Sequence, residues 1–218
     1  MSMDAVEDRR NRLVDSLVRR GYVVSPAVED AMRRVRREEF VPARLRPDAY
    51  VDTPLPIGGG QTISAPHMVA IMAEKLDLSP GHKVLEVGAG SGYHAAVVAE
   101  LVRPGGHVYT VERVKSLARF AEDNLSRAGY SDTVTVISAD GSLGFLENAP
   151  FDRIFVACGA PDVPSPLVDQ LSDGGKMLVP VGGMTYQNLV KVEKKDGRLV
   201  SENCGGCVFV PLIGEHGY

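Results

Sequence analysis

The sequence predicts a doubly wound α/β fold with a mostly parallel sheet, an antiparallel C-terminal edge and additional N-terminal helices. Two observations predict this fold. From residue 65 onward, short apolar runs of strand length alternate with helical patterns through short links, which is typical of a parallel sheet. Near the C-terminus the helical patterns stop, and strand-like runs joined by a turn predict an antiparallel hairpin. The 23 glycines and 14 prolines suit a chain with many tight turns.

The N-terminal part of the chain predicts two helices. Apolar residues fall roughly on one face of a helix over residues 4–20, which ends at Gly21. A second helix is expected over residues 26–37, with Pro26 at its first position. Several arginines gather late in this helix, and we interpret them as a solvated helix face, with contact to an acidic group as the alternative. These arginines are Arg33, Arg34, Arg36 and Arg37.

Residues 40–64 form a long stretch rich in proline and glycine, without clear periodicity. A loop of this length in a compact domain is usually functional or disordered. Its apolar side chains, which include Phe40, Tyr50 and Leu55, favour an ordered loop that lies over the core.

The rest of the chain supplies the sheet and its helices in order. Ser64 is expected to cap the helix that follows it, with Pro66 in the first turn. The predicted helices are 65–77, 93–101, 114–128 and 166–171, and the predicted parallel strands are 84–87, 107–111, 134–137, 153–157 and 176–181. The predicted C-terminal strands are 188–194, 198–200 and 208–212, with a turn at 195–197.

The charge distribution and the lengths of the apolar runs exclude several classes of function. The net charge is −4, with a basic surplus in residues 1–46 and an acidic surplus in the rest. An acidic main body gives no electrostatic footprint for nucleic acid. The apolar runs are far shorter than the ~20 residues of a membrane span, and the charge-rich start does not resemble a secretion signal. We therefore expect a soluble, cytoplasmic protein without nucleic-acid or membrane partners.

The cysteines and histidines do not predict a metal site. Three cysteines occur, of which Cys204 and Cys207 form a C-G-G-C that we interpret as two small residues in a turn, with a disulfide or a redox role as the alternative. A zinc site usually needs four ligands, and the five histidines lack metal-binding spacing. We expect no metal.

The strongest local signal is a glycine-rich turn between a predicted strand and a predicted helix, residues 84–92. Its spacing, G-x-G-x-G, differs from the G-x-G-x-x-G of dinucleotide folds. Acidic residues stand at three successive strand ends, as Glu86, Glu112 and Asp140. A carboxylate after the second strand can accept both hydroxyls of a ribose. The pattern favours S-adenosylmethionine, a nucleoside with a free ribose and a positive charge, over the alternative of three solvated loop acids.

The methyl acceptor is narrowed by two motifs that the sequence lacks. Methylation of amino nitrogens typically uses an Asn/Asp-Pro-Pro-aromatic turn after the fourth strand, where this chain has residues 157–161, Ala-Cys-Gly-Ala-Pro. Methylation of pyrimidine carbons typically uses a Pro-Cys dipeptide, which does not occur. An oxygen nucleophile or a small molecule remains.

Several blocks resemble one known family. Residues 50–70, which include Gln-Thr-Ile-Ser-Ala-Pro-His at 61–67, closely resemble protein-L-isoaspartate O-methyltransferases. This family belongs to the class I S-adenosylmethionine-dependent methyltransferases, so the resemblance implies a Rossmann-like sheet. The resemblance covers roughly residues 10–218. Its other blocks are 85–93, 159–161 with Pro164, 169–171 with 174–176, 180–182 and 209–214.

The resemblance implies an activity and a division of the chain. The family transfers a methyl group from S-adenosylmethionine to the free α-carboxyl of L-isoaspartyl residues in damaged proteins and peptides, and releases S-adenosyl-L-homocysteine. That carboxylate has a reference pKa near ~3.5 and is already ionised at pH 7, so no general base is needed. Catalysis would come from in-line placement and exclusion of water. Residues 1–64 would cover the ligands, residues 65–218 would form the cofactor-binding domain, and the protein would be a monomer.

The resemblance also assigns roles to residues. Ser64 would be the catalytic residue that orients the acceptor carboxylate by a hydrogen bond, since no Ser-base pair indicates a covalent nucleophile. Glu86, Glu112 and Asp140 with Gly141 would hold the amino-acid end, the ribose and the adenine region. The implied cofactor contacts are Gln61, Thr62, Ile63, Ser64, His67, Glu86, Gly88, Ala89, Gly90, Gly92, Glu112, Arg113, Asp140 and Gly141. The implied substrate contacts are Ile57, Ser64, Val181, Gly182, Val210, Pro211 and Leu212.

Alternatives stay open at two levels. At the level of residues, Ser64 could be a plain helix cap, His67 a structural histidine, and the apolar substrate contacts ordinary strand ends in the core. At the level of function, the same scaffold could methylate a different carboxyl or a small molecule. It could also be an inactive cofactor-binding module that recognises partner proteins.

Overall fold

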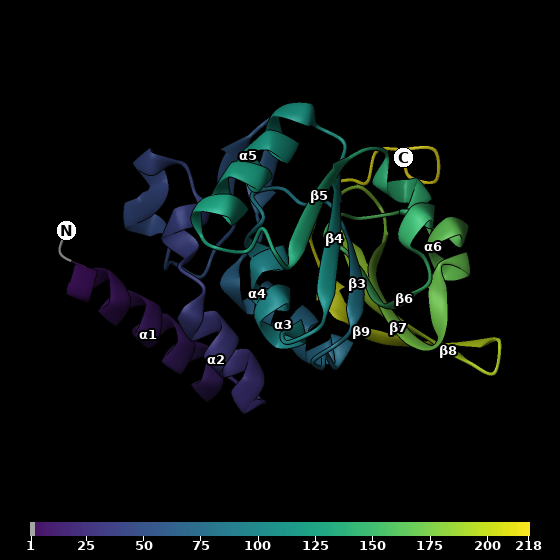
Figure 1. The fold of residues 1–218 in the computed structure, drawn as a ribbon, viewed down its shortest axis with the longest axis horizontal. Coiled ribbons are helices and arrows are strands. Elements are labelled where there is room, and N and C mark those ends of the chain that lie inside the picture. The colour runs from purple at the N-terminus through teal and green to yellow at the C-terminus, as the bar shows by residue number, and fades with distance from the viewer. Residues whose placement is uncertain (1–2) are drawn as a thin grey trace.

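The computed structural model describes residues 3–218 and is built around a seven-stranded sheet with the strand order β5-β4-β3-β6-β7-β8-β9 (Figure 1). Strands β3 to β7 run parallel, and β8 and β9 add an antiparallel edge. The predicted fold class is therefore confirmed. The strands are β3 Lys83–Val87, β4 His107–Glu112, β5 Val134–Ser138, β6 Phe151–Val156, β7 Leu171–Gly182, β8 Gln187–Lys195 and β9 Arg198–Cys207.

Strand β3 lies at the point where the order of the strands reverses. It pairs with β4 on one side and with β6 on the other, so the chain builds outward from β3 to β5 and then returns. In open α/β sheets, ligands bind beyond the carboxyl ends of the strands at such a switch point. The fold thus places a binding crevice after Val87.

Helices cover both faces of the sheet. Figure 1 shows α3, α4 and α5 on one face and α6 on the other. Along β3 the side chain of Val84 belongs to the apolar cluster on the α4 side, while Leu85 and Val87 belong to the cluster on the α6 side. Side chains of β3 are thus buried on both faces, as expected of a parallel strand covered by helices. The helices are α3 Pro66–Leu76, α4 Tyr93–Val102, α5 Lys115–Arg127 and α6 Ser165–Asp169.

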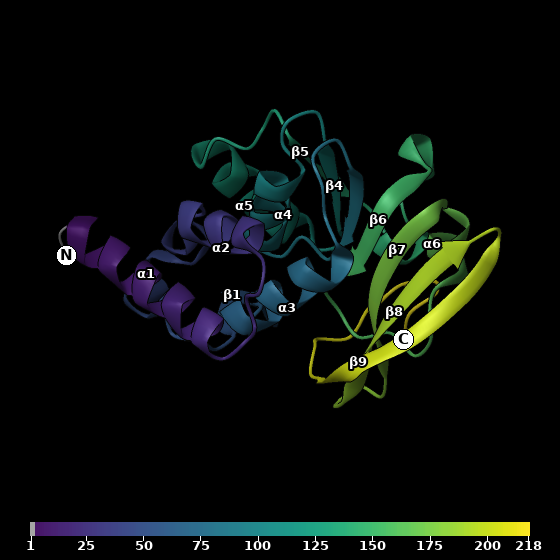
Figure 2. The same ribbon diagram turned by 90° about the horizontal axis from the view of Figure 1, so that it is seen from below.

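Two N-terminal helices, α1 Met3–Arg19 and α2 Pro26–Arg34, lie outside α3 and α4, at the end of the molecule opposite β9 (Figure 2). Ser25 caps α2, because its hydroxyl accepts a hydrogen bond from Val28 N–H at 3.3 Å. The α2 helix ends at Arg34 rather than residue 37, since Val35 adopts an extended conformation.

The interpretation of the arginines as a solvated face is wrong for Arg37. Arg37 starts a 3₁₀ helix, Arg37–Phe40, and its side chain is fully buried. Its Nε donates to the carbonyl of Ala49 at 2.9 Å, and its guanidinium lies 4.8 Å from the centre of the Tyr93 ring. Arg33 is also engaged, with ion pairs to Asp15 and Glu29.

The segment 40–64 is ordered and packs on the core, as predicted, but it contains a hairpin that was not predicted. Strands β1 Leu55–Gly58 and β2 Gln61–Ile63 pair antiparallel. Gly58 at the end of β1 and the two turn residues, Gly59 and Gly60, all have positive φ. Such short strands, one of which contains a proline, give too little alternation to be recognised.

The capping prediction for Ser64 is wrong. The N-cap position of α3 is Ala65, which makes no side-chain cap. A residue from the preceding loop caps the first turn instead. Asp52 Oδ1 accepts a hydrogen bond from the backbone N–H of His67 at 2.9 Å. The hydroxyl of Ser64 makes no hydrogen bond with the described residues 3–218, so it does not stabilise the start of α3.

The C-terminal third also departs from the predictions. Strand β7 begins at Leu171, where a helix was expected, and β9 runs through Cys204 and Cys207, which are strand residues rather than turn residues. Residues 208–212 do not join the sheet, and only an isolated bridge forms there. The predicted turn at 195–197 is confirmed, with positive φ at Asp196 and Gly197.

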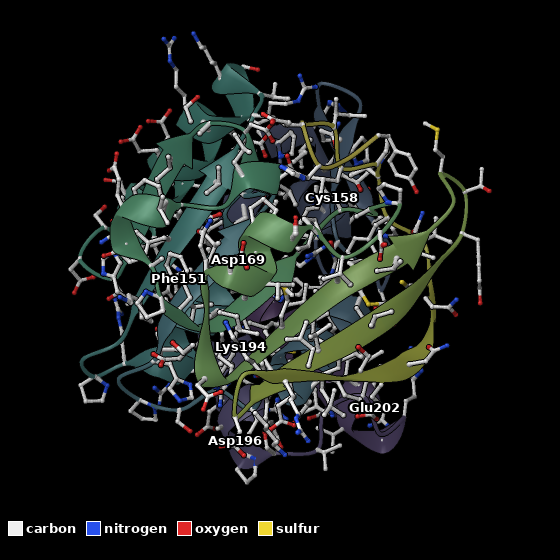
Figure 3. All side chains as sticks on the ribbon, turned by 90° about the vertical axis from the view of Figure 1, so that its right-hand side faces the viewer. Phe151, Cys158, Asp169, Lys194, Asp196 and Glu202 are labelled. Carbon is white, nitrogen blue, oxygen red and sulfur yellow. The ribbon has the colours of Figure 1, made fainter. Side chains whose placement is uncertain are left out.

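Strand β8 is tied to the short helix α6 through Lys194. Figure 3 shows this lysine beside the end of α6 that carries Asp169. Its ammonium donates to the carbonyl of Val168, at the C-terminal end of the helix, at 3.2 Å and to that of Leu171, at the start of β7, at 3.0 Å. Among residues 3–218, no helix has the length and apolar character needed to cross a bilayer.

Candidate active site

The glycine-rich turn after β3 forms the floor of the crevice. Gly88, Gly90 and Gly92 have φ of +97°, +54° and +86°, which only glycine adopts readily. Gly92 is the N-cap position of α4, and a Cβ there would lie 2.9 Å from the side chain of Leu125. The turn therefore depends on glycine both for its backbone conformation and for close packing.

Glu112, at the end of β4, braces this turn. One of its carboxylate oxygens accepts a hydrogen bond from Gly90 N–H at 3.0 Å, and the other accepts one from Val114 N–H at 2.8 Å. Each oxygen keeps a lone pair for a ligand. The carboxylate is thus held in place by the backbone of the two loops that line the crevice.

Glu86, on β3, is fully buried and only half satisfied. Thr110 donates a hydrogen bond to Glu86 Oε2 at 2.6 Å, but Oε1 has no partner among residues 3–218. Burial raises the pKa of Glu86 to about 8, and the hydrogen bond from Thr110 offsets only part of this shift. An adjacent positive charge would ionise this carboxyl and be stabilised by it.

Asp140 anchors the C-terminal tail through hydrogen bonds. Its carboxylate accepts hydrogen bonds from Ser142 N–H and from Glu215 N–H, both at 2.9 Å. Burial pushes the pKa of Asp140 upward, but these hydrogen bonds hold it below its usual range. Asp140 therefore fixes the tail against the loop after β5, while its neighbour Gly141 faces the crevice.

The crevice contains three adjoining cavities, which we call the strand-end, inner and outer cavities. The strand-end cavity lies over the carboxyl ends of β3, β4 and β6. Among the predicted residues it is lined by Gln61, Thr62, Gly88, Gly90, Glu112, Arg113, Gly141, Val210, Pro211 and Leu212. Val210, Pro211 and Leu212, expected to touch the substrate, thus also border the predicted cofactor region.

The inner cavity is small, about 30 Å³, and lies between β2, β3 and the start of α4. Glu86 lines it together with His94, whose two ring nitrogens are buried without partners in the described part of the chain. Burial lowers the pKa of His94 to about 3, so its imidazole is neutral. The other predicted residues that border this cavity are Thr62, Ile63, Ser64, Gly88, Ala89 and Gly90.

The outer cavity, about 310 Å³, opens on the other side of Ser64. Ser64 lines both the inner and the outer cavity, as do Thr62 and Ala157. His67 also lines the outer cavity, so it borders the site. The remaining wall is mainly apolar: Pro54, Ala65, Met68, Val208, Phe209 and Val210.

Five predicted residues line none of these cavities. Gly92 caps α4, and Asp140 holds the tail. Val181 bridges to Ala160, and the carbonyl of Gly182 accepts a hydrogen bond from the Tyr218 hydroxyl. Ile57 packs under the glycine turn, with its Cδ1 3.4 Å from where a Cβ on Gly90 would stand.

The sequence reasoning missed some lining residues. Ala157 borders all three cavities, and Cys158 borders the strand-end cavity from the position labelled in Figure 3. Both directly follow β6, so the rule that ligands meet strand ends could have found them. Cys207 and Phe209 line the outer cavity, and no local pattern pointed to them.

The residues around β3 suit a cationic nucleoside. The braced carboxylate of Glu112 would repel a pyrophosphate, and Glu86 Oε1 lacks a cationic or hydrogen-bonding partner among residues 3–218. With the strand order of the sheet, this site defines an S-adenosylmethionine-dependent methyltransferase of class I. The family model for protein-L-isoaspartate(D-aspartate) O-methyltransferases matches residues 8–217. The chain belongs to the protein-L-isoaspartate O-methyltransferase family.

Curated relatives agree with this assignment. A protein-L-isoaspartate O-methyltransferase from Hyperthermus butylicus is 59% identical over 219 residues, with 97% of this chain and 91% of the relative covered. One from Methanopyrus kandleri is 60% identical over 210 residues, with 96% and 93% covered. The similarity therefore spans nearly the whole of both proteins.

A solved structure shares the fold. The chain resembles a β-aspartate methyltransferase from Plasmodium falciparum, solved in complex with S-adenosyl-L-homocysteine, with a TM-score of 0.82 and 30% identity. The match covers 94% of this chain and 98% of that one. Because the cover is nearly complete, the N-terminal helices belong to the shared fold as well as the sheet.

Proposed function

We propose that this protein transfers the methyl group of S-adenosylmethionine to the free α-carboxyl of L-isoaspartyl residues in damaged proteins and peptides, and releases S-adenosyl-L-homocysteine. Membership of the family supports this activity. The single observation that carries it is the position of Ser64. Ser64 makes no hydrogen bond within residues 3–218, and it lines both the inner cavity, which contains Glu86, and the mostly apolar outer cavity.

The cofactor would be held by the strand ends and by the hairpin above them. Glu112 would accept the ribose hydroxyls with its remaining lone pairs, and Glu86 would face the charged amino-acid end. Gly141 would border the adenine region, with Asp140 fixing its loop. When bound, the cofactor supplies an electrophilic methyl group on a sulfonium. The other proposed contacts are Gln61, Thr62, Ile63, Ser64, Gly88, Ala89, Gly90 and Arg113.

The protein's own contribution to catalysis would be placement. The acceptor carboxylate is ionised at neutral pH, so the site needs no base to activate it. Ser64 would donate a hydrogen bond to one carboxylate oxygen, which leaves the other oxygen aimed at the methyl group. The β1–β2 hairpin would keep water out of the crevice. A direct transfer of this kind needs no covalent enzyme intermediate.

Fewer residues are proposed to contact the peptide than the sequence suggested. Ser64 and Val210 line the outer cavity, so they remain the main candidates. Pro211 and Leu212 border the strand-end cavity next to Val210 and could contact the reacting end of the peptide. Ile57, Val181 and Gly182 would support these walls from behind.

The proposal is tested by methyl transfer from labelled S-adenosylmethionine to two synthetic peptides. The peptides differ only in having L-isoaspartate or L-aspartate at one position. Base-labile label on the isoaspartyl peptide alone is the expected result. Label on neither peptide, with cofactor binding intact by calorimetry, would direct the search to other carboxyl or small-molecule acceptors.

We further propose that the protein acts as a monomer in the cytoplasm, without nucleic acid. The acidic surplus outside the N-terminal segment supports the last point. The division at residue 64 also stays a proposal, with residues 1–64 covering the ligands and residues 65–218 binding the cofactor. Sedimentation with and without a peptide substrate would test the monomer.

A further inference from the structure

His67 borders the outer cavity and is held more firmly than a residue of a simple cavity wall. Its ring Nδ1 lies 2.8 Å from Asp52 Oδ1, and its backbone N–H donates to the same oxygen at 2.9 Å. Arg20 donates to the other oxygen of Asp52 at 2.7 Å. The ring of Tyr22 lies beside the imidazole, with 5.4 Å between ring centres. Side chains from two other segments of the chain thus fix this imidazole.

These contacts determine which atom of the imidazole stays available. Burial pushes the pKa of Asp52 upward, but the hydrogen bonds from His67 and Arg20 outweigh burial and hold it below its usual range, so Asp52 is a carboxylate at neutral pH. A carboxylate can only accept hydrogen bonds, so Nδ1 of a neutral His67 carries the proton. Nε2 is then an acceptor. It has no partner among the described residues and is not buried.

The outer cavity gives this acceptor few protein partners. The wall is mainly apolar, and the polar side chains that share it are Thr62 and Ser64 on the cofactor side. A peptide that enters the cavity brings backbone N–H groups that lose their water. An accessible acceptor on a fixed ring can satisfy one of them. Such a contact reads the peptide backbone, so it does not depend on the flanking side chains.

We propose that Nε2 of His67 accepts a hydrogen bond from a backbone N–H of the bound isoaspartyl peptide, with Asp52 and Arg20 as positioning residues. The inference rests on the proposed function, because it needs a peptide in the outer cavity. It assigns His67 to the substrate rather than to the cofactor. His67 lines neither the strand-end cavity nor the inner cavity, which agrees with this assignment.

The test uses His67→Asn, because the asparagine amide can still donate to Asp52 but has no atom at the place of Nε2. We expect the KM for the isoaspartyl peptide to rise about tenfold, which corresponds to the free energy of one lost hydrogen bond between buried groups. The affinity for S-adenosyl-L-homocysteine, measured by calorimetry, and kcat are expected to stay within about twofold. His107→Asn is the matched control, since His107 bonds to Thr135 at the opposite end of the strands.

A set of isoaspartyl peptides, each methylated at one backbone nitrogen, locates the contact. One of these peptides should lose affinity for the wild type but not for His67→Asn, which is the coupling expected of a direct pair. Equal losses in both proteins at every position, or an unchanged KM in His67→Asn, would overturn the inference while the repair activity stands. If the wild type does not methylate the unmodified isoaspartyl peptide, the proposed function fails and the inference fails with it.

Discussion

Ser64 shows how one hydroxyl can distinguish turnover from binding. It makes no hydrogen bond within residues 3–218 and does not cap α3, so its removal leaves no protein group unpaired. We expect Ser64→Ala to lower kcat for the isoaspartyl peptide about ten- to a hundredfold, the usual effect of losing a hydrogen bond to a charged group. Cofactor affinity, measured by calorimetry, should change less than about twofold.

The exposed Ser201→Ala on β9 serves as the control for Ser64→Ala and should behave as wild type. Parallel losses of turnover and cofactor affinity in Ser64→Ala would show that Ser64 shapes the cofactor site. The orienting role would then be wrong.

Glu86 makes the stability of the free protein depend on pH. Its pKa is about 8 in the folded state and near ~4.5 when unfolded, so the folded state holds an extra proton between these values. Stability therefore falls as pH rises from about 4.5 to 8, by on the order of 3 kcal/mol at pH 7. We expect Glu86→Gln to remove this fall, as measured by urea unfolding at pH 5 and pH 8.

The exposed Glu122→Gln on α5 is the control for Glu86→Gln and should keep the wild-type dependence on pH. The wild type and Glu86→Gln having the same slope over this range would contradict the assignment of the slope to Glu86. An added cationic ligand should flatten the wild-type curve, because it favours the ionised carboxylate.

At the scale of elements, the glycine turn sets the distance between α4 and α5. A Cβ on Gly92 would lie 2.9 Å from Leu125, and φ there is +86°. Gly129 has a similar φ of +83°, but a Cβ there would meet no atom within 4 Å. Substitution of Gly129 therefore measures the cost of the positive φ alone, without a steric clash. We expect Gly129→Ala to cost about 1–2 kcal/mol of unfolding free energy, and Gly92→Ala about 1–3 kcal/mol more. Equal losses by thermal unfolding would show that Leu125 yields without cost.

The elements that could be predicted from sequence differ physically from those that could not. Strands β3 to β6 are central or parallel strands with apolar runs that are short, continuous and easily recognised. Gly205 and Gly206 make the sequence predict a turn at the end of strand β9. In the structure the strand continues through both residues, and Gly205 adopts a positive φ of +108° within it. Its pairing with β8 comes from tertiary contacts that local propensity does not record.

The site shows the same limit. The acids at strand ends follow from the topology of the sheet, so Glu86 and Glu112 could be found from spacing alone. The contact between Asp52 and His67 could not, because a loop of irregular backbone brings the two together. Asp140 fits the strand-end rule, yet its carboxylate accepts a hydrogen bond from the backbone N–H of Glu215 in the C-terminal tail, 75 residues away in the sequence.

At the scale of the whole molecule, one apolar cluster joins the N-terminal helices to the sheet. It runs from Leu17 in α1 through Val98 in α4 to Phe209 near the C-terminus. We therefore expect thermal unfolding in a single transition, with far-ultraviolet and near-ultraviolet circular dichroism changing together. S-adenosyl-L-homocysteine at about 100 times its Kd should add about 2.7 kcal/mol. Two separate transitions would show that residues 1–64 unfold on their own.

The strand-end and outer cavities share the wall formed by Thr62, Ala157 and Val210. Because the two cavities border the same residues, one compound could occupy both. A bisubstrate inhibitor, with an adenosyl group joined by a short linker to an isoaspartyl peptide, would bind its second half at high effective concentration. Its potency would depend on the length of the linker, with an optimum set by the separation between the adenosyl site and the acceptor carboxylate.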